Sequence, residues 1–183
     1  MIVSLKYFPL LVLLAGALPG DRLAASASSI VGTSAQSEAT SALAGELRNV
    51  IRVVDGDTIV VRPNEKVRLI GVDTPETVHP KKTVECFGRD AKQFTRDAVD
   101  GKTIRLVMDT VNAKRRNKDR YGRTLAYVYL PDGKMLNAEL IRQGYAHAYT
   151  RVSFRYLVEF REFERQARTQ LVGLWSSCSL NQP

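Results

Sequence analysis

The sequence has few of the residues that bind zinc. Its 183 residues include two cysteines, Cys86 and Cys178, and two histidines, His79 and His147. There is no Cys-x-x-Cys pair, and the histidines show neither His-x-His nor His-Glu-x-x-His spacing. A zinc site is therefore not expected, and we expect both histidines to be structural.

Hydrophobic runs long enough to span a membrane are also missing. The apolar run at the N-terminus covers residues 8–18, follows Lys6 and precedes small residues that end at Ala27. Eleven residues are too few to cross a bilayer, which needs about 20, so a retained membrane anchor is the weaker alternative. Because this order is typical of a secretory signal, we expect residues 1–27 to be cleaved and the mature protein, without a membrane span, to be secreted or periplasmic.

Acidic residues are outnumbered, with 19 Asp and Glu against 27 Lys and Arg, so the net charge is +8. Removal of residues 1–27 takes away Lys6, Asp21 and Arg22 and lowers the net charge to +7. A protein this basic is drawn to polyanions such as nucleic acid, anionic lipid or acidic polysaccharide. Charge alone does not choose among these partners.

The length fits a single folded domain. Residues 28–45 are mostly small and polar, with little apolar surface to offset the entropy of ordering, so we expect a flexible leader there. We expect the folded domain at 46–178, a short tail at 179–183, and a monomer. In an oxidising compartment Cys86 and Cys178, separated by 92 positions, are expected to form a disulfide; the alternative is two buried thiols.

Local patterns predict a mixture of strands and helices. Short apolar runs bounded by turn signals predict strands at 50–54, 58–61, 67–72, 103–108 and 124–130. Apolar residues at three-and-four spacing predict helices at 88–99 and 154–171, and Asn137 with Gly144 suits the start and stop of a third at 137–143. The order of elements is compatible with an α+β, antiparallel, Greek-key OB barrel.

Three segments concentrate carboxylates and arginines: 54–58, 68–76 and 119–123. Each alone has an ordinary interpretation, respectively a hairpin turn, a strand with a capped turn and a solvated basic loop. Together they supply oxygen ligands for a divalent ion, a carboxylate that can act as a base and guanidinium groups for phosphate. This combination predicts metal-assisted cleavage of phosphodiester bonds.

The chain from about Leu47 to Trp175 resembles staphylococcal nuclease and its exported bacterial relatives. The first matching stretches are Val-Asp-Gly-Asp-Thr at 54–58 and Arg-Leu-Ile-Gly-Val-Asp-Thr-Pro-Glu-Thr at 68–77. The remaining matches are His-Pro-Lys-Lys at 79–82, Asp-Arg-Tyr-Gly-Arg-Thr-Leu-Ala-Tyr at 119–127, Asp-Gly-Lys-Met-Leu-Asn at 132–137, Arg-Gln-Gly at 142–144 and Gly-Leu-Trp at 173–175. The resemblance implies a five-stranded antiparallel OB-fold barrel with three helices.

The resemblance also implies a calcium site. Asp57 and Asp73 match the direct ligands of the family, the carbonyl oxygen of Thr74 completes the site, and Asp55 acts through bound water. Calcium suits such a site because it prefers hard oxygen ligands in an irregular geometry.

The remaining site residues follow from the same resemblance. Glu76 matches the general base, and Arg68 and Arg123 match the arginines that bind phosphate. The implied reaction is in-line attack on phosphorus by a water that Glu76 orients, leaving 3′-phosphate ends. The residues implied to bind substrate are Arg120, Tyr121, Lys81, Lys82 and Tyr149.

Two other functions fit parts of the sequence. The first is a non-catalytic OB-fold module that binds single-stranded nucleic acid by stacking and basic charge. Such modules usually lack the carboxylates that are present here. The second is a cationic protein that binds envelope polymers. We expect a calcium-dependent nuclease with DNA or RNA as its substrate.

Overall fold

The computed structural model describes residues 45–78 and 83–178. The predicted signal peptide at 1–27, nearly all of the predicted leader at 28–45, and the predicted tail at 179–183 lie outside the described residues. Within the described part of the chain, no helix is both long enough and apolar enough to cross a membrane.

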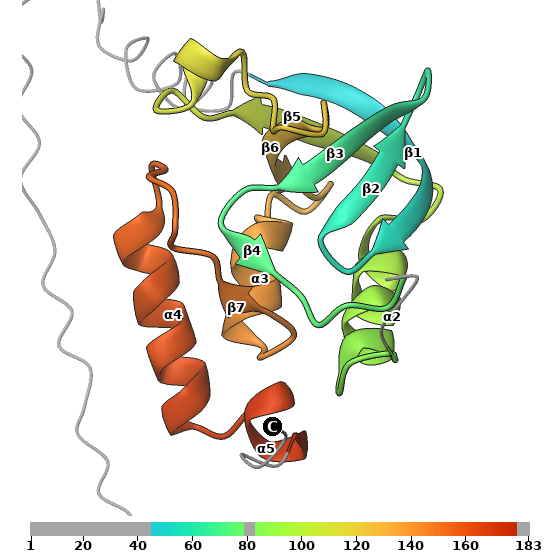
Figure 1. The fold of residues 1–183 in the computed structure, drawn as a ribbon. Helices are drawn as coiled ribbons and strands as arrows, with labels where there is room; N and C mark the ends of the chain where they lie inside the picture. The colour runs from blue at the N-terminus through green and yellow to red at the C-terminus, as the bar shows by residue number, and fades with distance from the viewer. Residues whose placement is uncertain (1–44, 79–82, 179–183) are drawn as a thin grey trace, which may run out of the picture.

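A closed barrel of five strands forms the upper part of the molecule in Figure 1. Around the barrel the strands lie in the order β1, β2, β3, β6, β5, and β5 pairs with β1 to close it. Their bounds are Glu46–Asp55 (β1), Thr58–Val61 (β2), Glu65–Leu69 (β3), Thr103–Met108 (β5) and Thr124–Tyr129 (β6). The predicted α+β class and the five-stranded OB-type barrel are confirmed.

One strand pair differs from the predicted antiparallel arrangement. Four of the five pairs are antiparallel, but β3 and β6 are parallel, with Val67 opposite Thr124 and Leu69 opposite Ala126. Parallel neighbours need a long connection. The chain between β3 and β6 provides it, because it contains the helix Gly88–Val99 and the strand β5. The prediction is wrong for this pair because a short apolar run contains no information about the direction of its partner.

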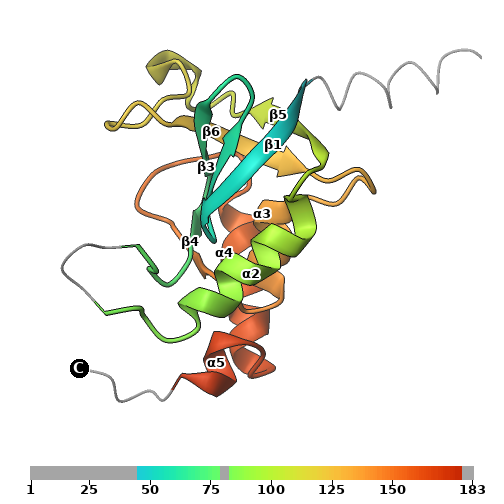
Figure 2. The ribbon, with the colours of Figure 1, turned by 90° about the vertical axis from the view of Figure 1, so that its right-hand side faces the viewer.

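The described residues form four α-helices, one more than predicted. Their bounds are Gly88–Val99 (α2), Leu136–Arg142 (α3), Leu157–Thr169 (α4) and Leu174–Ser177 (α5), and Ala113–Arg115 forms a 3₁₀ turn (η1). Helix α2 has the predicted bounds, whereas α4 ends before Leu171, which has a positive φ of 53° and an exposed side chain. Helix α3 contacts both α2 and α4 and lies beneath the barrel (Figures 1 and 2).

Gly71 interrupts the strand that was expected at 67–72. Its φ of +71° favours glycine, and a Cβ atom there would lie 2.5 Å from the ring of Phe154. The chain turns here, and Val72–Asp73 (β4) then pairs with His147–Ala148 (β7) in a separate two-stranded sheet. Strand β3 therefore ends at Leu69, and the turn that follows it sets the position of Asp73.

Asn137 lies inside helix α3 and does not cap it, contrary to the prediction. Its side chain is fully buried, and its Oδ1 accepts the Val128 N–H at 2.9 Å. Its Nδ2 donates to the carbonyl oxygens of Ile70 at 3.0 Å and Ala126 at 3.3 Å. One amide thus joins α3 to β6 and to the turn that follows β3. The residue at the N-cap position is Met135, whose side chain makes no capping hydrogen bond.

We expect Asn137→Ala to destabilise the protein strongly. The change leaves the buried Val128 N–H and the Ile70 carbonyl without this partner, and each such buried group costs about 1 to 3 kcal/mol. The free energy of unfolding, measured with urea, should therefore fall by about 2 kcal/mol or more. The control is Asn64→Ala at an exposed asparagine, which should change it by less than about 0.5 kcal/mol. Equal effects of the two substitutions would contradict a structural role for the buried amide.

Candidate functional site

Carboxylates from two neighbouring segments meet at one end of the barrel. Asp55 and Asp57 flank the turn between β1 and β2, and Asp73 and Glu76 come from β4 and the residues after it. They line a pocket of about 560 Å³. The other lining residues are Val54, Thr58, Lys66, Arg68, Thr74, Val78, Glu85, Arg120, Tyr121 and Arg123.

Hydrogen bonds hold the two acidic segments together. The Thr74 N–H donates to Asp57 Oδ2 at 3.2 Å, and the Thr77 hydroxyl donates to Asp55 Oδ1 at 2.7 Å. Gly56 lies between the two aspartates, and a Cβ atom there would approach the Thr74 side chain to 2.7 Å. Only glycine allows this close contact, which brings the carboxylates of both segments into one pocket.

A buried threonine on α2 supports the same turn from the other side. Thr95 is fully buried, and its hydroxyl donates to the Gly56 carbonyl oxygen at 2.6 Å. Thr95 was not among the predicted site residues. A polar residue on the buried face of α2, near Ala91 and Val99, is the one signal in the sequence that could have indicated it.

Arg68 lies between two of the carboxylates. Its Nη1 is 2.6 Å from Asp57 Oδ2, and its Nη2 is 3.2 Å from Asp73 Oδ1. The side chains of Arg68 and Asp57 are only 15% and 10% exposed, so the ion pair is shielded from most of the solvent. The guanidinium thus links β3 to the β1–β2 turn and to β4.

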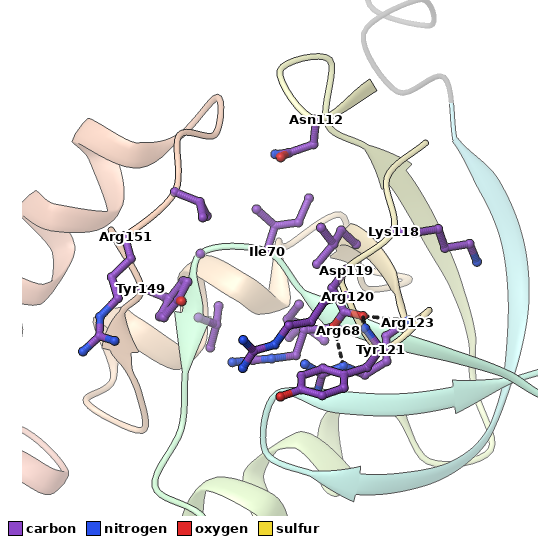
Figure 3. A pocket seen from close by; sticks show the side chains of 15 residues that line it. Arg68, Ile70, Asn112, Lys118, Asp119, Arg120, Tyr121, Arg123, Tyr149 and Arg151 are labelled. Atoms are coloured by element: carbon purple, nitrogen blue, oxygen red, sulfur yellow. Dashed lines mark hydrogen bonds and ion pairs between the residues drawn. The ribbon is translucent and has the colours of Figure 1, made fainter. Parts of the chain in front are cut away.

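The loop before β6 presents a second arginine. Asp119 Oδ1 accepts the N–H groups of Tyr121 and Arg123, and Asp119 Oδ2 accepts Nε of Arg123 at 2.6 Å. Nη1 of Arg123 reaches the Thr58 hydroxyl at 3.4 Å. Figure 3 shows Asp119 beside Arg123. Asp119, which the sequence analysis did not assign to the site, therefore fixes both the loop and the direction of Arg123.

Burial and mutual repulsion perturb the acids of the site. Burial, and then a hydrogen bond with the Glu76 carboxyl, raise the pKa of Asp55 to about 6. Burial also raises the pKa of Asp73, and the nearby charge of Asp57 acts in the same direction. For Asp119 burial acts upward, but the hydrogen bonds from Arg123 and Tyr121 leave its pKa below its usual value. For Asp73 the charge of Arg68 acts against the rise, so burial is the main reason that the pKa values of Asp55 and Asp73 are raised.

A second pocket, of about 740 Å³, adjoins the first. The two pockets share Arg68, Arg120, Tyr121 and Arg123. The second has apolar residues such as Ile70 and Leu125 in its wall, and Figure 3 shows Tyr149 and Arg151 across it from Tyr121. A planar apolar group attached to a phosphate would fit across this pair of pockets.

Comparison with known proteins gives a consistent result. A family model described as "Staphylococcal nuclease homologue" matches residues 66–177. The chain is 42% identical over 133 residues to the thermonuclease of Staphylococcus hyicus, covering 70% of this chain and 75% of the relative. It is 40% identical over 135 residues to the thermonuclease of Staphylococcus intermedius (72% and 77%), and 38% identical over 130 residues to endonuclease YncB of Bacillus subtilis (68% and 59%). The chain belongs to the staphylococcal nuclease family.

The structure brings together most of the site residues that were predicted from the family resemblance. Nine of them line the 560 Å³ pocket: Asp55, Asp57, Arg68, Asp73, Thr74, Glu76, Arg120, Tyr121 and Arg123. Tyr149 lies apart from these and lines the adjoining pocket. Lys81 and Lys82 lie outside the described residues.

Some features of this family member became visible only in the structure. Lys66, Thr58 and Glu85 line the pocket although no role was predicted for them.

The expected disulfide joins Cys86 and Cys178, whose Cα atoms are 5.9 Å apart. His147 contacts Glu164 through Nδ1 and packs edge-on against Trp175, in keeping with a structural role.

Oxygen atoms are the ligands that the site could offer to a metal ion. Within residues 45–78 and 83–178, no three or more His, Cys, Asp or Glu residues form a ready-made metal cluster. Asp57 and Asp73 nevertheless converge on a single guanidinium, so their oxygens approach one cationic centre from two segments. Hard oxygen donors of this type suit Ca²⁺ or Mg²⁺.

We expect Thr95→Val to disturb the acidic turn while keeping the shape of the side chain. Valine cannot donate to the Gly56 carbonyl, and leaving that buried oxygen unpaired should lower the free energy of unfolding by about 1 to 3 kcal/mol. Thr95→Ser keeps the donor and should recover most of this loss. Urea unfolding of the three proteins measures the effect, and a serine variant as unstable as the valine variant would rule out the hydrogen bond as the cause.

Proposed function

We propose that this chain is an exported, calcium-dependent nuclease that cuts DNA or RNA by attack of water on phosphorus and leaves 3′-phosphate ends. The chain hydrolyses phosphodiester bonds of nucleic acids, as its membership of the staphylococcal nuclease family and its similarity to thermonucleases and an endonuclease support. The observation that carries the mechanism is the pocket in which Arg68 and Arg123 meet five carboxylates.

The proposed calcium ligands are the oxygens at the β1–β2 turn and at β4. Asp57 and Asp73 would bind directly, with the Thr74 carbonyl as a third donor and Asp55 acting through water. The raised pKa of Asp73, caused by burial and by the charge of Asp57, supports a cation here because positive charge would relieve that repulsion. When bound, calcium supplies charge that stabilises the negative phosphoryl group as the bond is broken.

Arg68 and Arg123 are the proposed phosphate-binding groups. A guanidinium offers two parallel N–H donors, which match two oxygens of a phosphate. Carboxylates orient both arginines in the free protein, Asp57 with Asp73 for Arg68 and Asp119 for Arg123. Because these partners limit the motion of each guanidinium, little further ordering is needed when a phosphate binds.

Glu76 is the proposed general base. Its Oε1 accepts the Val78 N–H at 2.8 Å, and its carboxyl hydrogen-bonds with Asp55. These contacts hold the group in the pocket with Arg68, where it can orient a water molecule and accept a proton from it. The metal ligands are other carboxylates, which leaves this one for proton transfer.

The adjoining pocket supports a substrate larger than a bare phosphate. We infer that the nucleoside lies there, next to Tyr149, with Arg120 and Tyr121 beside its phosphate. The guanidinium of Arg120 lies 4.8 Å from the centre of the Tyr121 ring, which is 68% exposed. Lys81 and Lys82 would add positive charge at the edge of the site.

Export is part of the proposal. Residues 1–27 would be the cleaved signal, 28–45 the leader, 46–178 the nuclease domain and 179–183 the tail, with the mature protein acting as a monomer outside the cytoplasm. The disulfide between the two cysteines supports this location, because such bonds persist mainly in oxidising compartments.

A non-catalytic OB-fold module that binds nucleic acid is the rival function. It would need the basic residues and the aromatic side chains of the second pocket but not the acidic turn. The convergence of Asp55, Asp57, Asp73 and Glu76 in one pocket favours the enzyme, because four carboxylates repel a polyanion unless they serve chemistry or bind a cation.

We expect activity on DNA and RNA to require calcium and to disappear in a chelator. Asp57→Asn should weaken calcium binding, because it removes a charged ligand, and should lower turnover by at least tenfold at limiting calcium. Asp132→Asn, at an exposed turn away from the pocket, is the matched control and should behave like the unchanged protein. Digestion of single- and double-stranded DNA and RNA over a calcium titration measures both effects, and full activity in a chelator would exclude the metal site.

Glu76→Gln and Arg68→Lys should fail in different ways. Loss of the base should lower kcat by about 10²- to 10⁴-fold while nucleotide binding is kept, since the arginines remain. Lysine at position 68 cannot reproduce the bidentate contact, so it should weaken nucleotide binding and turnover together. Kinetics and nucleotide titration with calcium present separate the two cases. Near-normal turnover of Glu76→Gln would mean that another group is the base.

A further inference from the structure

Two glutamates hold each other through reciprocal hydrogen bonds at the edge of the site. The Glu76 N–H donates to the Glu85 carboxylate oxygen Oε2 at 3.0 Å, and the Glu85 N–H donates to the Glu76 carbonyl oxygen at 3.0 Å. The backbones of Glu76 and Glu85 are therefore held side by side. The backbone of Glu76 is fixed on both its N–H and its C=O side by one residue.

The start of α2 packs against the same backbone. A Cβ atom at Gly88 would lie 3.0 Å from the Pro75 carbonyl oxygen and 3.2 Å from that of Glu76. The Gly88 N–H in turn donates to the Glu85 carbonyl oxygen at 3.0 Å. Residues 85–88 thus form a tight turn that lies directly against residues 75 and 76.

A covalent bond anchors this turn to the far end of the chain. Cys86, between Glu85 and the first residue of α2, is bonded to Cys178 at the end of α5. Helix α5 is itself attached to the C-terminal end of α3, because the Leu174 N–H donates to the Gly144 carbonyl oxygen at 2.8 Å. Position 85 is therefore held by α2 on one side and, through the disulfide, by the α3–α5 region on the other.

We propose that Glu85 is a positioning residue for Glu76 and that the Cys86–Cys178 disulfide holds Glu85 in place. This inference rests on the proposed role of Glu76 as the base. Glu85 lines the pocket, but its carboxylate binds the Glu76 backbone N–H. It fixes the peptide from which the Glu76 side chain projects, and with it the direction of the carboxylate toward the water and the phosphorus.

Removal of Glu85 should lower kcat by the amount that misalignment of a catalytic group costs. A displacement of about 1 Å in a catalytic group can cost about 100-fold in rate. Since the Val78 N–H still binds the Glu76 carboxylate, removal of Glu85 should loosen Glu76 without releasing it fully. We expect a 10- to 100-fold loss in kcat, with little change in KM or in nucleotide affinity.

The first experiment compares Glu85→Ala with Glu85→Gln at saturating calcium. Glutamine keeps an oxygen that can accept the Glu76 N–H but removes the charge, whereas alanine removes both. Positioning predicts that glutamine keeps at least a third of the wild-type kcat and alanine falls 10- to 100-fold, with nucleotide affinity kept by both. Glu159→Ala, at an exposed glutamate on α4, is the control. Equal losses in alanine and glutamine would overturn the proposal in favour of the charge, and no loss in alanine would also overturn it.

The second experiment tests the anchor by a double-mutant cycle. The Cys86→Ser, Cys178→Ser protein should lose kcat in the same way as Glu85→Ala, with KM unchanged, at a temperature where circular dichroism shows it to be folded. Combining both changes should cost less than the product of the separate losses, because they act on one element. If the two losses in kcat multiply fully, or if kcat is unchanged in the cysteine variant, the disulfide does not act on Glu76 through Glu85 and this part of the proposal is overturned.

Failure of this inference can be told from failure of the proposed function. Glu76→Gln is measured in the same series. If it loses turnover while Glu85→Ala does not, Glu76 stays the base and only the positioning role is wrong. If Glu76→Gln keeps near-normal turnover, the proposed base is wrong and the positioning role is overturned with it.

Discussion

The contact of Arg68 with Asp57 and Asp73 connects the barrel to its chemistry. The three side chains come from β3, the β1–β2 turn and β4. The contact therefore forms only when the barrel holds these three segments in their correct relative positions. Removing two charges from water is costly unless their geometry and hydrogen bonding are good. The bonds from Thr74 and Thr58 to Asp57 meet that requirement. A site built on such a contact depends on the backbone that surrounds it.

Hydrogen bonds from polar side chains fix that backbone. Thr95 holds the Gly56 carbonyl, Asn137 holds β6 and the Ile70 carbonyl, and Asp119 organises the loop that bears Arg123. Apolar contacts tolerate small shifts, whereas a buried hydrogen bond specifies distance and direction together. Directional contacts are needed here, because catalytic groups must lie close to their productive positions.

The sequence predicted best what depends on local periodicity. The bounds of α2 and β5 were predictable because their apolar spacing is regular. The motifs that match a known family predicted a set of site residues, nine of which line one pocket. Three features could not be predicted, because each is set by a partner distant in sequence or by a positive φ. They are the parallel pairing of β3 with β6, the β4–β7 sheet and the end of α4 before Leu171. Thr95 and Glu85 were not predicted as site residues for a related reason. Neither belongs to a motif, and each acts through the backbone of another residue.

The charges in the pocket explain why so many hydrogen bonds and close contacts surround it at one end of the barrel. Five carboxylates and four basic residues line the 560 Å³ pocket, in a chain that is basic overall. A polyanion is attracted to the protein as a whole. Within the pocket, burial is the main cause that raises the pKa values of Asp55 and Asp73, and the nearby charge of Asp57 adds to it. Groups that repel one another separate unless other contacts hold them. The bonds from Thr74 and Thr77, the packing of Gly56 and the disulfide-anchored turn at Glu85 act against that separation. They keep the carboxylates in the same pocket as Arg68 and Arg123.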